Sequence, residues 1–80
     1  MDLQLIEGEF STTDGLELIV AIINTKIKFH ENKICNSHHE EDIKSREKKI
    51  KGLQNSLNDI RIFLNTKNNG VKINALITIE

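Results

Sequence analysis

Proline, tryptophan and tyrosine are absent from this 80-residue chain, which has one cysteine and three phenylalanines. A single cysteine excludes a disulfide framework within the chain and suits a reducing compartment, so we expect a cytoplasmic protein. The longest apolar run, residues 18–23, is too short to span a membrane. The first residues lack the basic and apolar regions of a signal peptide. We therefore expect no membrane association.

Neither sign of charge dominates the chain, whose formal net charge is −1 with 29% charged and 38% hydrophobic residues. This balance excludes a polyelectrolyte and indicates a folded domain. At 9.1 kDa the chain has room for one domain, spanning residues 1–80. Its abundance of isoleucine, asparagine and lysine is typical of AT-rich bacterial genomes.

Alternating apolar residues predict a strand at each end of the chain, over about residues 2–10 and 71–79. The C-terminal alternation is regular and is formed by Val71, Ile73, Ala75, Ile77 and Ile79. Alternation is weaker at the N-terminus, where Gly8 indicates either a bulge or a close approach of another backbone.

Helical periodicity predicts a helix over about residues 12–35, with Ser11 as its N-cap. One apolar row contains Leu16, Ile19, Ile23, Ile27, His30 and Ile34. A second row contains Leu18, Ile22 and Phe29. The resulting apolar arc is wider than a helix covered on one side requires.

A second helix is predicted over about residues 38–66, with Ser37 as its N-cap. Its apolar heptad consists of Ile43, Ile50, Leu53, Leu57, Ile60 and Leu64. Arg46 interrupts this heptad, and Gly52 lies in the helix interior, where glycine is about 1 kcal/mol less favourable than alanine. Gly52 indicates either a close backbone contact or a tolerated cost.

The predicted fold is α+β in the order β-α-α-β, with a long antiparallel helical hairpin packed on a small antiparallel sheet of the N- and C-terminal strands. A two-stranded sheet is marginal in water, and the second apolar row has no partner within one hairpin. We therefore expect a homodimer, in which two copies complete the bundle and the sheet. The predicted interaction residues are Leu18, Ile22, Phe29, Ile73 and Ile77. The favoured function is a self-associating protein–protein interaction module, serving as an accessory or regulatory subunit for a protein partner still to be identified.

Residues 43–72 contain eight basic and two acidic residues, whereas residues 1–23 contain five acidic and no basic ones. The alternative function is therefore association with nucleic acid through the basic face of the second helix. Its candidate phosphate contacts are Lys44, Lys48 and Lys51. Without tyrosine or tryptophan for base stacking, a solvated helix face is the simpler interpretation of this cluster.

Four potential metal ligands lie near the predicted turn between the helices: His30, Cys35, His38 and His39. Their spacing matches no standard zinc arrangement, so we expect no metal and no other cofactor. The same residues offer no convincing nucleophile–base pair, and the scattered glycines form no phosphate-binding loop. We therefore expect a protein that is not an enzyme.

Overall fold

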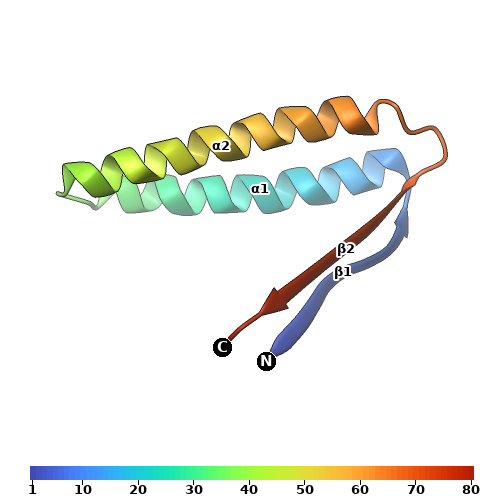
Figure 1. Ribbon diagram of the computed structural model, residues 1–80, viewed down its shortest axis with the longest axis horizontal. Coiled ribbons are helices and arrows are strands. Elements are labelled where there is room, and N and C mark those ends of the chain that lie inside the picture. Colours follow the sequence, from blue (N-terminus) through green and yellow to red (C-terminus); the bar gives the residue numbers. More distant parts are fainter.

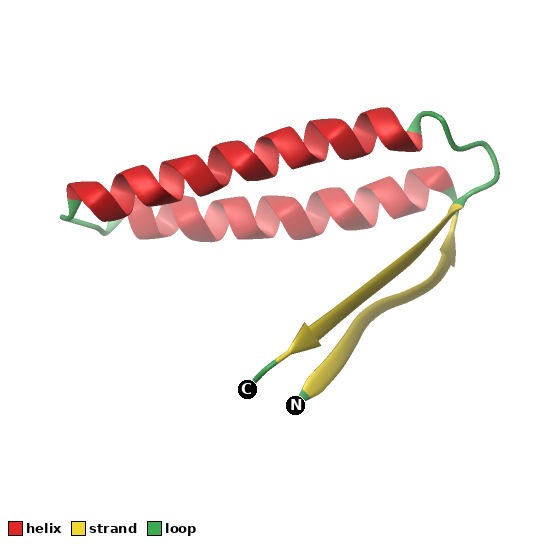
Figure 2. Cartoon of the chain, viewed as in Figure 1, coloured by secondary structure: helices red, strands yellow, loops and turns green.

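The computed structural model describes residues 1–80 and has the α+β fold that the sequence predicts. Its elements are β1 (Asp2–Phe10), α1 (Thr12–Cys35), α2 (Glu40–Leu64) and β2 (Val71–Thr78). The helices form a long antiparallel hairpin, and the strands pair antiparallel in a two-stranded sheet (Figures 1 and 2). The chain termini lie side by side, because the amino group of Met1 donates to the carbonyl oxygen of Ile79 at 2.7 Å.

The first helix begins where the sequence predicts. Ser11 precedes it in an extended conformation, and its Oγ accepts a hydrogen bond from the backbone N–H of Asp14 at 3.1 Å. This bond satisfies one of the free N–H groups of the first turn.

The second helix begins later than the sequence predicts. Its first residue is Glu40, and the preceding residue, His39, provides no side-chain cap. Ser37 is therefore not the N-cap; its Oγ accepts a hydrogen bond from the N–H of His39 at 3.2 Å, inside the turn. The chain completes its reversal at His39, so Ser37 lies inside the turn and not at the helix cap.

The bulge in β1 lies before Gly8 and not at it. Pairing with β2 shifts by one residue between Gln4 and Ile6, and the Gln4 amide donates to the carbonyl oxygens of Ile6 at 2.9 Å and Ala75 at 3.2 Å. Gly8 stays paired with Ile73 at a φ of 143°, which favours glycine.

Strand pairing separates the sheet into one apolar and one polar face. Residues paired directly across the strands lie on the same face. The apolar sheet face consists of the pairs Leu3/Ile77, Ile6/Ala75, Gly8/Ile73 and Phe10/Val71. The other face consists of Asp2/Thr78, Gln4/Leu76, Glu7/Asn74 and Glu9/Lys72.

The sheet meets the helices at Gly15, near the start of α1. A Cβ atom placed on Gly15 would lie 2.7 Å from Cγ2 of Val71 and 3.2 Å from Cδ1 of Ile73. A side chain at this position would push Val71 and Ile73 away, so glycine permits the close approach of the apolar sheet face. Beyond this junction the strands diverge from the helices (Figure 1).

The chain is flat and open for its size. Its radius of gyration is 15.1 Å, against about 12 Å for a compact domain of 80 residues. It exposes 6380 Å² of surface, whereas a compact monomer of 9.1 kDa exposes about 4,900 Å². Four of the 80 residues are buried, and no large side chain is completely enclosed. About 1,500 Å² of surface is thus exposed beyond what this mass requires.

Candidate association surface

Helix α1 carries two apolar seams on different sides. The first is the row from Leu16 to Ile34 that the sequence predicts; its residues are half-buried or buried in the helical hairpin. The second follows the heptad spacing of Gly15, Leu18, Ile22 and Phe29. Because Gly15 touches the sheet, the second seam starts at the junction and continues away from it.

Exposure along the second seam increases with distance from the junction. Leu18 is half-buried, Ile22 is 40% exposed and Phe29 is 52% exposed. Phe10 and Leu18 line a shallow hollow close to the junction. The sheet therefore covers only the first turns of the seam.

The apolar sheet face shows the same trend. Val71 and Ile73 are half-buried beside Gly15, whereas Ile77 is 39% exposed near the free end of the sheet. Both surfaces are apolar, start at one junction and diverge (Figure 1). We call them together the apolar wedge, which comprises Leu18, Ile22 and Phe29 of α1 and Leu3, Ile73, Ile77 and Ile79 of the sheet.

The structure places all five predicted interaction residues in the apolar wedge. Ile73 and Leu18 are partly covered within the chain, and Ile22, Phe29 and Ile77 are exposed. Sequence analysis missed several exposed apolar residues, namely Leu3, Leu5, Ile62, Phe63, Leu76 and Ile79. The regular alternation predicted over residues 71–79 already contained Ile79, whereas Ile62 and Phe63 lie off the heptad of α2 and carry no periodic signal.

A polar layer crosses the helical hairpin near its turn. Arg46, the exception in the α2 heptad, places Nη1 3.0 Å from Nδ1 of His30 and Nε 3.3 Å from Oδ2 of Asp42. Its guanidinium also lies 5.9 Å from the centre of the Phe29 ring. The two residues that interrupt the apolar rows, His30 and Arg46, therefore pair with each other.

The contact with Arg46 requires a neutral His30, since Nδ1 must accept the hydrogen bond. His30 is only 6% exposed, and Nε2 has no hydrogen-bond partner. Burial, supported by the positive charges of Arg46, Lys49 and Lys26, lowers the pKa of His30 below its ordinary value. Partial burial raises the pKa of Asp42, but hydrogen bonds and the charge of Arg46 outweigh it and lower that pKa overall.

The potential metal ligands near the turn do not converge. His30 is buried against Arg46, whereas Cys35, His38 and His39 are exposed. No three His, Cys, Asp or Glu side chains of the chain form a group that could hold a metal ion.

The candidate phosphate contacts lie on the outer face of α2. Lys44, Lys48 and Lys51 are all exposed, and Lys44 pairs with Glu40 at 3.5 Å. Lys48 and Lys51 form no ion pair. One ion pair joins the acidic segment, residues 1–23, to the basic segment, residues 43–72: Nζ of Lys72 lies 3.7 Å from Oε1 of Glu9.

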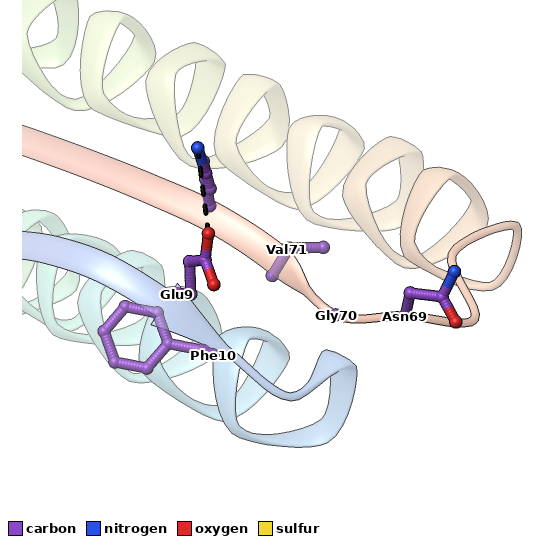
Figure 3. A pocket seen from close by; sticks show the side chains of 6 residues that line it. Glu9, Phe10, Asn69, Gly70 and Val71 are labelled. Carbon is purple, nitrogen blue, oxygen red and sulfur yellow. Dashed lines mark ion pairs between the residues drawn. The ribbon is translucent and has the colours of Figure 1, made fainter.

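This ion pair borders a hollow of about 230 Å³ at the junction (Figure 3). Phe10, Asn69, Gly70 and Val71 complete its wall. The carboxylate of Glu9 and the ammonium group of Lys72 pair with each other while both side chains remain largely exposed to solvent.

Comparison of the chain with protein-family models, curated proteins and solved structures yields no match. Neither helix combines the length and apolar content needed to cross a membrane.

Proposed function

We propose that this protein is a self-associating interaction module that acts as an accessory or regulatory subunit. The observation that carries the proposal is the apolar wedge, on a chain that exposes about 1,500 Å² more surface than its mass requires. Monomeric proteins rarely expose contiguous apolar patches beyond a few hundred Å².

The size of the excess exposed surface favours a second copy of the chain as the partner that covers the apolar wedge. If each of two copies covered its excess, the interface would bury about 3,000 Å² in total, within the range of obligate homodimers. One two-fold operation would also supply partners to both surfaces of the wedge, because each copy carries the same pair.

Light scattering during size exclusion, from high concentration down to about 1 µM, tests the proposal. We expect a dimer; dissociation near 1 µM would correspond to about −8 kcal/mol. A monomer at every concentration would contradict it.

Phe29→Glu provides the disrupting variant. A glutamate at this position faces Lys33 one turn later and the guanidinium of Arg46, so its charge suits the monomer. Asn24→Glu is the matched control, because it adds the same charge to an exposed position of α1 outside the wedge. We expect dissociation with the first variant and an unchanged mass with the second.

A second candidate function is binding of nucleic-acid phosphates by Lys44, Lys48 and Lys51. It is supported by their shared exposure on one face of α2 and by the lack of ion pairs at Lys48 and Lys51. Such binding weakens steeply as salt rises, so it should be strongest at about 50 mM salt. Absence of binding to duplex or single strands at that concentration would exclude it.

A further inference from the structure

We infer that two copies pair through the free edge of β2, with Leu76 opposite Leu76 of the second copy, to form a continuous four-stranded antiparallel sheet. This inference rests on the proposed self-association and specifies which backbone groups join the copies.

The two free edges of the sheet differ in regularity. Strand β1 contains the shift between Gln4 and Ile6 and the unusual φ of Gly8, and such irregularities protect an edge from pairing. Strand β2 runs from Val71 to Thr78 without a bulge or a positive φ. The regular edge is therefore that of β2.

The free edge of β2 lies on the side of the helical hairpin. Figure 1 shows β2 between β1 and the helices, so a strand added to this edge would extend the sheet on that side.

Hydrogen bonding to β1 determines which residues of β2 have free backbone groups. Met1 and Ile79 exchange both of their backbone hydrogen bonds, so the N–H and C=O of Ile79 point toward β1. Orientation alternates along a strand, and the free groups therefore belong to Lys72, Asn74, Leu76 and Thr78.

One register of these groups is complementary in charge. With Leu76 on the two-fold axis, Lys72 lies opposite Glu80 of the second copy, and Asn74 lies opposite Thr78. On the apolar sheet face the same register pairs Ile73 with Ile79 and Ala75 with Ile77. Moving the axis to Ala75 would place Lys72 opposite Thr78 and lose the charge pair. Leu76, which is 56% exposed on the otherwise polar face, gains an apolar partner in itself.

Cysteine cross-linking tests this register in a Cys35→Ser background. Leu76→Cys should form a disulfide-linked dimer on mild oxidation, because residues paired across such a sheet lie about 5.5 Å apart at Cα, within disulfide range. Asn74→Cys and Thr78→Cys should each remain unlinked alone, since two copies of Asn74 would lie about 14 Å apart. Mixing these two variants should produce the linked heterodimer.

The same set separates failure of the pairing from failure of self-association. A dimer by light scattering in which Leu76→Cys does not cross-link would overturn the strand pairing and leave the proposed function standing. Efficient cross-linking of Asn74→Cys alone would overturn the register. A monomer in every measurement would contradict both proposals.

Charge reversal provides an independent measurement. Glu80→Lys places two lysines opposite each other and should raise the dissociation constant roughly twofold to thirtyfold over the two symmetric contacts. Adding Lys72→Glu should recover part of the loss. An equal or additive loss in the double variant would overturn the register.

Discussion

Two glycines in the helices provide a matched test of how the sheet rests on α1. A Cβ on Gly15 would lie 2.7 Å from Cγ2 of Val71, closer than carbon atoms pack, whereas a Cβ on Gly52 would meet nothing within 4 Å. Both positions are helical and neither has a positive φ, so alanine is compatible with both backbones.

The two alanine variants should change stability in different directions. Gly52→Ala should stabilise the protein by about 1 kcal/mol, because alanine is the better helix former. Gly15→Ala gains at most the same amount but forces Val71 and Ile73 to move, and such overpacking costs about 1–3 kcal/mol. Its net effect should range from about zero to a loss of about 2 kcal/mol.

Thermal unfolding followed by circular dichroism measures this difference. For a domain of this size, 1 kcal/mol corresponds to roughly 4–8 °C in Tm. Both variants must be compared at one protein concentration, because association shifts Tm. Equal stabilisation by the two variants would refute the contact between the sheet and α1.

Val71→Ala removes the closest atom and should restore much of the loss in the Gly15→Ala background. A double-mutant cycle should therefore give a favourable coupling of about 0.5–3 kcal/mol. Strict additivity would mean that Val71 is not the residue that limits the approach.

Two further predictions concern the helical hairpin. The pKa of His30 is lowered in the folded state, so protonation favours the unfolded chain and the free energy of unfolding should decrease as the pH falls below 6.5. The Tm measured from pH 8 to pH 5 should therefore fall less in His30→Phe than in the unaltered protein, and an equal fall in both would contradict this assignment. Leu64 is 4% exposed, so Leu64→Ala should lose about 2–5 kcal/mol in urea unfolding, whereas a loss below about 1 kcal/mol would show that its surroundings collapse around the smaller side chain.

The order and type of the elements could be predicted because their apolar residues are periodic, with a clear period of two for β2 and of about 3.5 for the α2 heptad, and a weaker alternation for β1. The start of α2 could not, since Ser37 is as suitable for a turn as for a helix cap. Whether Ser37 caps α2 or lies within the turn depends on the residue at which the chain completes its reversal. The local sequence does not specify that residue.

The polar layer illustrates a second limit of sequence reasoning. His30 and Arg46 each interrupt an apolar row, and both exceptions are visible in the sequence. Their pairing depends on the register of α1 against α2, which follows from the length of the turn between them. In the hairpin the guanidinium donates to Nδ1 of the imidazole at 3.0 Å, so two apparent defects form one contact.

The sequence also does not predict how the sheet is oriented relative to the helices. The sequence predicts that the sheet packs on the hairpin, and it does so at Gly15. Nothing in the periodicity indicates that the strands then diverge and leave Ile22 and Phe29 exposed. That geometry depends on the short connection at Ser11 and on Gly70, whose φ of 93° and close approach to the Phe10 carbonyl exclude other residues.

Three features of the chain are individually unfavourable in water: a two-stranded sheet, a regular free edge on β2 and an uncovered heptad seam on α1. Burying the seam alone would leave the edge open, and pairing the edge alone would leave the apolar side chains exposed. A two-fold arrangement through β2 doubles the sheet and occupies the edge, and the second copy brings its own apolar residues as partners for the seam. The features also start from one junction at Gly15, so a single contact point within the chain determines the shape that a second copy must complement. For this reason we expect Gly15→Ala to weaken association as well as folding, whereas Gly52→Ala should leave the dissociation constant unchanged.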